Sequence, residues 1–190
     1  MKSSLSKERI KNLNEFCHRV NIKFKDVELL NQAFNHRSVT NEKKSEGNNE
    51  RLEFLGDSVL GMVTSSYLYN TLDNPEGELA KIKSAVVSEK ALAPIAIKLG
   101  IDKLIVLGHG EELSGGKFRK AIVADIFEAF IGAMFLDSGL ENVKKFIYNY
   151  VIPMIENNEV DFFDDYKSVL QELVQTDKKS LEYVIMDMLT

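Results

Sequence analysis

Apolar residues recur along most of the chain at the spacing that marks one face of an α-helix. Ser6 stands where it can cap a helix that runs to about Val20, and Asp26 stands before a second helix that ends near His36. Further helices are predicted over residues 49–71, 78–87, 88–100, 118–137 and 139–152. The pattern therefore predicts an all-α body.

Turn-forming residues separate these helices at two places. DNPEG, residues 73–77, is typical of a turn, and HGEELSGGKF, residues 109–118, is typical of a glycine-rich loop. Pro94 lies inside a helical pattern, where its missing N–H should bend or shorten the helix.

The helix predicted at residues 49–71 carries three acids, Glu50, Glu53 and Asp57, on one face. Like charges at this spacing repel by roughly 0.2–0.5 kcal/mol per pair on an exposed helix. Phe54 is unusual because it falls beside the acids. On a helical wheel the core-facing stripe lies opposite them and consists of Leu52, Leu55, Val59, Met62 and Val63.

The helix predicted at residues 118–137 repeats this arrangement with Asp125 and Glu128. Its apolar side lies opposite the two acids and contains Phe127, Phe130 and Met134. The residues that share the acidic face are small, so another helix could approach it closely; they are Ala121, Ala129 and Gly132.

If the two acidic faces meet, Glu53, Asp57, Asp125 and Glu128 form a cluster of four carboxylates. Oxygen ligands of this kind suit Mg²⁺ or Mn²⁺, whereas zinc prefers cysteine and histidine. A magnesium ion held in this way could assist hydrolysis of a phosphodiester. The alternative interpretation is that these acids are simply solvated on two separate surfaces.

Composition limits the other possibilities. The chain has 190 residues, a net charge of -5 and a single cysteine, Cys17, so an internal disulfide is excluded. No apolar run is long enough for a membrane helix and the N-terminus lacks a signal-peptide pattern, so a soluble, cytoplasmic protein without a membrane partner is expected. No nucleotide cofactor is expected either, because Gly116 stands where a P-loop would need lysine.

Two stretches carry a resemblance to a known family. ERLEFLGDSVL, residues 50–60, resembles the signature of the ribonuclease III family, and ADIFEAFIGAMFLD, residues 124–137, resembles its second acidic motif. FNHRSVTNE and LGHGEELSGGKFR are similar to the segments that precede these two motifs, so the likeness covers about residues 5–155. Lys120 and Ala121 depart from the pattern, where the family often has an acid and a serine.

The resemblance implies an all-α, homodimeric endonuclease domain that cleaves double-stranded RNA with Mg²⁺, for which Mn²⁺ may substitute. It implies that Glu53, Asp57, Asp125 and Glu128 hold the metal and that Asp57 and Glu128 are essential for chemistry. Glu50 and Glu76 match acids that shape the RNA cleavage site, and Phe54 matches an aromatic dimer contact. The implied products have 5′-phosphate and 3′-hydroxyl ends with short 3′ overhangs, and arise in processing of ribosomal and other RNA precursors.

The resemblance also predicts the domain organisation: a nuclease domain at 1–156, a linker at 157–164 and an incomplete double-stranded-RNA-binding domain at 165–190. Two other functions are less favoured. One is a protein that binds double-stranded RNA in the same valley without cutting it, which loss of a metal ligand would support, but all four acids are present. The other is a nuclease reduced to its catalytic domain that acts on structured ribosomal RNA, and the partial RNA-binding sequence argues against it.

Overall fold

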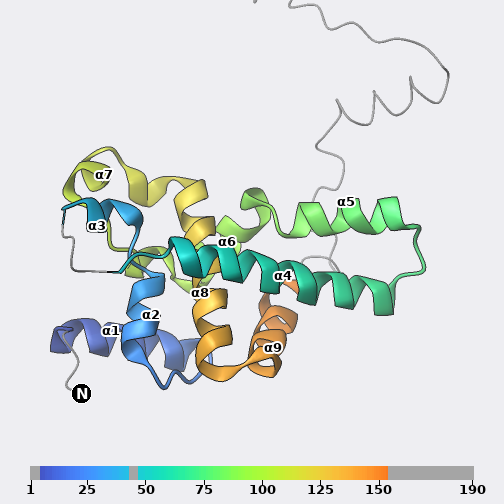
Figure 1. Cartoon of the computed structure of the whole chain (residues 1–190), viewed down its shortest axis with the longest axis horizontal. Helices are drawn as coiled ribbons and strands as arrows, with labels where there is room; N and C mark the ends of the chain where they lie inside the picture. The colour runs from blue at the N-terminus through green and yellow to red at the C-terminus, as the bar shows by residue number, and fades with distance from the viewer. Residues whose placement is uncertain (1–4, 43–46, 154–190) are drawn as a thin grey trace, which may run out of the picture. The chain divides into compact units, whose positions relative to one another are not determined.

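The computed structural model describes residues 5–42 and 47–153, and within these residues the fold is all-α (Figure 1). The predicted linker and RNA-binding domain lie outside the described residues. The helices are α1 (Lys7–Arg19), α2 (Val27–Ala33), α3 (Arg37–Glu42), α4 (Glu50–Thr71), α5 (Glu76–Val86), α6 (Glu89–Leu99), α7 (His109–Leu113), α8 (Lys120–Ser138) and α9 (Leu140–Tyr150), with short 3₁₀ turns η1 (Asp102–Leu104) and η2 (Gly116–Phe118). None of the described helices is long and apolar enough to cross a membrane.

The predicted caps form as the sequence indicates. The Ser6 hydroxyl accepts a hydrogen bond from the Arg9 N–H at 3.1 Å, and the Asp26 carboxylate accepts from the N–H groups of Glu28 and Leu29. These contacts satisfy N–H groups that have no partner within the first turn of a helix. Helices α1 and α2 therefore begin where the sequence predicts.

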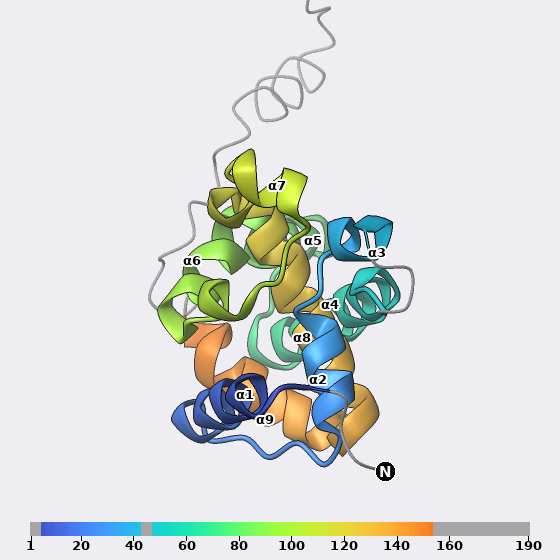
Figure 2. The ribbon, with the colours of Figure 1, turned by 90° about the vertical axis from the view of Figure 1, so that its left-hand side faces the viewer.

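Helix α8 is the centre of the fold. Figures 1 and 2 show it passing through the middle of the domain, and it packs against α2, α4, α6 and α9. Phe130 of α8 contacts Phe16 and Phe146 edge-on, with ring centroids 5.4 and 5.3 Å apart. This aromatic core fixes α8, and with it the acidic face that α8 presents to α4.

Two local predictions are wrong, and the pattern does not predict α3. Residues 109–118 are not only a glycine-rich loop, because they contain α7 and η2, and α5 begins at Glu76, inside the predicted turn. The helix is not shortened at Pro94, because α6 continues through it to Leu99, and the bend stays a prediction. The buried side chains around Pro94 pack α6 on α8, and this tertiary packing offsets the local cost of the missing hydrogen bond.

Met62 also differs from its prediction. The sequence pattern puts Met62 in the core-facing stripe of α4, yet the residue is 50% exposed. Met62 lies at the edge of that stripe, and the half of α4 that carries it forms a hairpin with α5, away from α8 (Figure 1). A helix in such a hairpin has fewer neighbours to cover it, so residues at the margin of the stripe stay in solvent.

Candidate active site

The two acidic faces meet where α4 crosses α8. Glu53 of α4 and Asp125 and Glu128 of α8 each offer a carboxylate oxygen, and these three oxygens lie within 4.8 Å of one another. All three residues are half-buried. A small donor set of oxygens at this separation fits a hard divalent cation.

Asp57 lies at the rim of this three-carboxylate cluster and not inside it. It is exposed, one turn after Glu53 on α4, and its oxygens are not among the three that converge. Its negative charge nevertheless raises the pKa of both Glu128 and Glu53. The structure therefore brings three of the four predicted metal ligands together and leaves the fourth facing solvent.

Burial and mutual repulsion make the cluster costly in its fully ionised form. The pKa of Glu128 is raised to about 8 by burial and by the charges of Asp57, Asp125 and Glu53. The pKa of Glu53 is raised to about 7, mainly by burial and the charge of Asp125, and that of Asp125 is raised by burial and by Glu89. Such a site gains from a cation, because a metal neutralises the repelling charges and displaces the protons.

Close approach of the backbones allows the acids to meet. Gly56 of α4 lies against the backbone of α8 at Glu128 and Gly132, and Gly132 lies against the backbone of α4 at Leu52. Leu52, Ala129 and Ala133 are buried together beneath the crossing. The prediction that small residues bring a second helix onto the acidic face is therefore confirmed for Gly132 and Ala129.

Glu50 lies at the start of α4 and contacts a cation that the sequence did not single out. The guanidinium Nη1 of Arg37 is 3.6 Å from Glu50 Oε1, and the amide of Asn48 donates to Glu50 Oε2 at 3.0 Å. Sequence spacing gives no signal for the contact of Arg37 with Glu50, because α3 and α4 are brought together only in the folded chain.

Glu76 lies far from the cluster of its own chain. Helices α4 and α5 pack side by side in opposite directions, with Gly61 facing Lys83: a Cβ on Gly61 would be 3.3 Å from Lys83 Cε. Glu76 therefore lies level with a part of α4 that comes about 15 residues after Glu53. That number of residues corresponds to about 22 Å along the helix axis. Within one chain the structure does not bring Glu76 to the other acids.

Phe54 projects from α4 beside the acids with 78% of its side chain exposed, in keeping with its position on the helical wheel. A large aromatic side chain left in solvent exposes apolar surface that a partner could bury. Phe54 thus does not belong to the core of the described domain.

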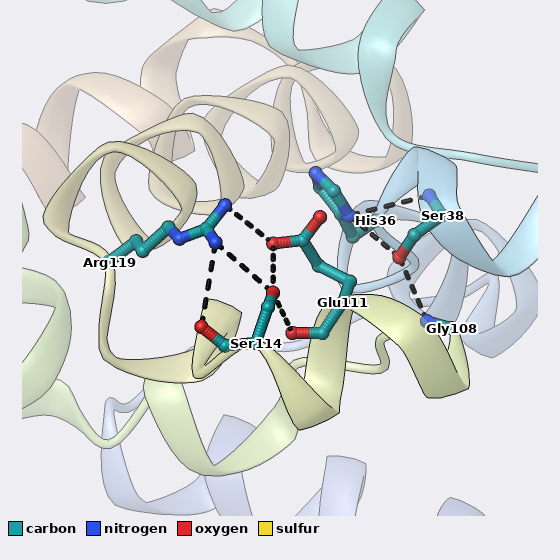
Figure 3. A network of polar contacts seen from close by, with 6 residues as sticks. All are labelled: His36, Ser38, Gly108, Glu111, Ser114 and Arg119. Carbon is teal, nitrogen blue, oxygen red and sulfur yellow. Dashed lines mark hydrogen bonds and ion pairs between the residues drawn. The ribbon is translucent and has the colours of Figure 1, made fainter.

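A polar network fastens the glycine-rich segment next to the site (Figure 3). Glu111 lies between Arg119 and His36, and the Arg119 guanidinium pairs with the Glu111 carboxylate at 2.8 Å. The Ser38 hydroxyl accepts from the Gly108 N–H at 2.8 Å and contacts His36 Nδ1 at 2.9 Å. The network joins α3 to α7, so both elements are held in a fixed relation beside α4.

Comparisons with known proteins agree with this geometry. A family model described as Ribonuclease-III-like matches residues 26–155. The chain is 52% identical to Ribonuclease 3 of Treponema denticola and 45% identical to Ribonuclease 3 of Bacillus velezensis, covering 95% of this chain in both cases and 75% and 74% of those proteins. The solved nuclease domain of ribonuclease III from Campylobacter jejuni is 38% identical and superposes with a TM-score of 0.69, covering 74% of this chain and 96% of that one.

These matches span both acidic motifs and the helices that position them, at identities that extend over most of the chain. The chain therefore belongs to the ribonuclease III family.

Proposed function

We propose that this chain hydrolyses double-stranded RNA at a Mg²⁺ centre built from Glu53, Asp125 and Glu128, with Asp57 as a further ligand at the rim. As a member of the ribonuclease III family it is a double-strand-specific endoribonuclease. The observation that carries the proposal is the convergence of three half-buried carboxylates whose pKa values are raised by burial and mutual repulsion. Manganese has the same preference for oxygen ligands and could substitute.

A divalent cation bound here would lower the pKa of a water molecule and neutralise charge on the phosphoryl group. The residues of the chain hold that cation and shape its surroundings. Glu53, Asp125 and Glu128 supply inward-facing oxygens, and Asp57 supplies a carboxylate on the solvent side, where RNA must approach. This makes Asp57 and Glu128 the residues that we assign as essential for the reaction.

The proposed products follow from the direction of the attack. The water oxygen forms a bond to phosphorus and the bond from phosphorus to the 3′ oxygen breaks, with the proton passing to the departing oxygen. This leaves one 5′-phosphate and one 3′-hydroxyl end. Two such cuts, staggered on opposite strands, would give short 3′ overhangs in the processing of ribosomal and other RNA precursors.

A homodimer is part of the proposal, supported by two observations. Phe54 is 78% exposed on the face of α4 that carries the acids, where a second copy of the chain could bury it. Glu76 is remote from the acids of its own chain, although it matches an acid of the cleavage site. A partner subunit that packs against α4 would allow Glu76 to serve the site of the other chain.

Cleavage of a long RNA duplex tests the proposal. The protein is incubated at low salt with duplex RNA and Mg²⁺, and in parallel with EDTA in place of the metal. Short duplexes with 5′-phosphate ends are expected with Mg²⁺ alone. A folded dimer that binds the duplex but leaves it intact would favour the alternative of an RNA-binding protein without nuclease activity.

Mixed dimers test the role of Glu76. One subunit would carry Glu76→Gln and the other Glu128→Gln. If each Glu76 serves the site of its partner, both changes fall on the same site and the second site stays intact, so cleavage of one strand is retained. If Glu76 serves its own chain, both sites are damaged and cleavage of either strand falls.

A further inference from the structure

Arg37 is a cation at the edge of an acidic site, and its side chain is held only loosely. It begins α3, its side chain is 67% exposed, and its guanidinium contacts Glu50 at 3.6 Å. Glu50 is itself 52% exposed. An exposed ion pair at this distance contributes little, so the guanidinium can exchange Glu50 for another anion at small cost.

The backbone of Arg37 is, in contrast, firmly placed. The neighbouring His36 N–H donates to the Val106 carbonyl at 3.0 Å, and the Ser38 hydroxyl on the other side accepts from Gly108 at 2.8 Å. The network in Figure 3 thus fixes both residues that flank Arg37. A fixed backbone, with a guanidinium held only by an exposed ion pair, suits a residue that must meet an incoming ligand.

The charge of Arg37 reaches the acids of both helices. It opposes the effect of burial and lowers the pKa values of Glu53 on α4 and Asp125 on α8 relative to what burial alone would give. Arg119, another arginine near this face, is already committed to Glu111 at 2.8 Å. Of these two arginines, Arg37 is therefore the one that is available for substrate.

An RNA strand entering this site meets a concentration of negative charge. When ionised, Glu50, Glu53, Asp57 and Glu128 all repel phosphate. One divalent cation does not neutralise the charge of these carboxylates and of the RNA backbone at the same time. A guanidinium offers several N–H donors in a planar fork that matches a phosphate group. A cation next to the metal would thus let the backbone of the strand approach the carboxylates.

We propose that Arg37 binds a phosphate of the RNA strand beside the metal centre and that Glu50 orients the guanidinium until RNA replaces it. This inference rests on the proposed function, since it assigns a substrate contact to the same site. It makes Arg37 a phosphate-binding residue of the cleavage reaction and gives Glu50 a positioning role.

The first test compares three variants on one short RNA duplex with Mg²⁺. Arg37→Gln should lower kcat/KM by about 10- to 100-fold, which is the range for loss of a hydrogen bond to a charged group. Arg37→Lys should recover part of this loss, because it restores the charge without the planar fork. The control is Lys11→Gln, which removes one exposed positive charge from α1, where Lys11 pairs with Glu15 at 3.8 Å. It should leave kcat/KM unchanged.

The second test identifies the phosphate itself. Duplexes are prepared with one uncharged methylphosphonate at successive positions around the cleavage site. At one position the parental enzyme should lose activity while Arg37→Gln shows no further loss, because the contact is already absent. The phosphate contact would be overturned if the loss from the methylphosphonate and the loss from Arg37→Gln added up at every position, while the thermal stability of the variant was unchanged.

Binding without metal separates this inference from the proposed function. The dependence of duplex affinity on salt should be shallower for Arg37→Gln than for Lys11→Gln by about 0.9 in the logarithmic slope, the value for one phosphate contact. If the parental chain cuts RNA but the two variants have equal slopes and equal activities, the role of Arg37 is refuted and the proposed function stands. If the parental chain does not cut, the proposed function fails, and the slopes still decide whether Arg37 contacts phosphate.

Discussion

Gly56 of α4 and Gly132 of α8 lie against each other where the two helices cross. A Cβ added to Gly56 would be 2.9 Å from the Gly132 nitrogen, and one added to Gly132 would be 3.1 Å from the Gly56 nitrogen. Each added Cβ would also overlap a carbonyl group of the opposite helix, at Glu128 or at Leu52. The two helices can therefore approach closely only because both residues lack a side chain.

We expect Gly132→Ala to destabilise the fold, since the obstacle is backbone and cannot rotate away. Overpacking of a tight core typically costs about 1–3 kcal/mol in the free energy of unfolding, measurable by urea denaturation. Gly77→Ala is the control, because nothing lies within 4 Å of an added Cβ there and the residue is helical. That variant should be neutral or more stable, and an equally small effect of Gly132→Ala would contradict the close crossing.

Substitution of the acids separates catalysis from binding. Asp57→Asn and Glu128→Gln should each lower duplex cleavage by at least about 100-fold, because several kcal/mol of transition-state stabilisation depend on the metal. RNA binding without metal should be largely retained. Cleavage at near the parental rate by either variant would show that the assigned role of that residue is wrong.

The same pair of variants tests the difference in position between the two acids. Glu128 is half-buried in the three-carboxylate cluster, whereas Asp57 lies at its rim. We therefore expect Glu128→Gln to weaken Mg²⁺ binding more than Asp57→Asn does, as measured by titration calorimetry without RNA. Equal losses in metal affinity would place Asp57 inside the donor set.

Stability without metal should fall as the pH rises. On folding, the pKa of Glu53 increases from 4.5 to about 7 and that of Glu128 from 4.5 to about 8. Between about pH 4.5 and about pH 8 the folded state therefore binds more protons than the unfolded state. The free energy of unfolding then decreases from about pH 4.5 to about pH 8 and is level above the higher pKa. Thermal unfolding in EDTA across this range measures the trend.

Glu128→Gln removes the group with the higher pKa and should flatten that profile. Saturating Mg²⁺ should also flatten it at neutral and alkaline pH, because the metal replaces the protons. A metal-free profile that rises with pH over the same window would contradict the raised pKa values.

Phe54→Ala should weaken dimerisation. Burial of a phenylalanine contributes about 1.5–3 kcal/mol, and a two-fold interface uses the contact twice, so the dimer dissociation constant should rise by at least about 100-fold. Phe118→Ala is a matched control: Phe118 is 89% exposed but belongs to η2 and not to α4. Sedimentation of both variants decides the matter, and an unchanged dimer for Phe54→Ala would remove Phe54 from the interface.

The sequence by itself determined the features that depend on neighbours within one or two helical turns. The capping side chains of Ser6 and Asp26 mark the starts of α1 and α2 as the structure has them. The spacing of Glu53 and Asp57, and of Asp125 and Glu128, puts each pair on one face, because helix geometry fixes that relation locally. The small residues Ala129 and Gly132 also indicated that a second helix covers the acids.

Only the tertiary structure decided how these faces meet. The rotation of α4 against α8 brings Glu53 into the cluster and leaves Asp57 at the rim, and this rotation depends on packing across the crossing as a whole. The contact of Arg37 with Glu50 and the network that holds α7 join segments distant in sequence. Their geometry is set by the summed burial of many side chains, so no local pattern encodes it.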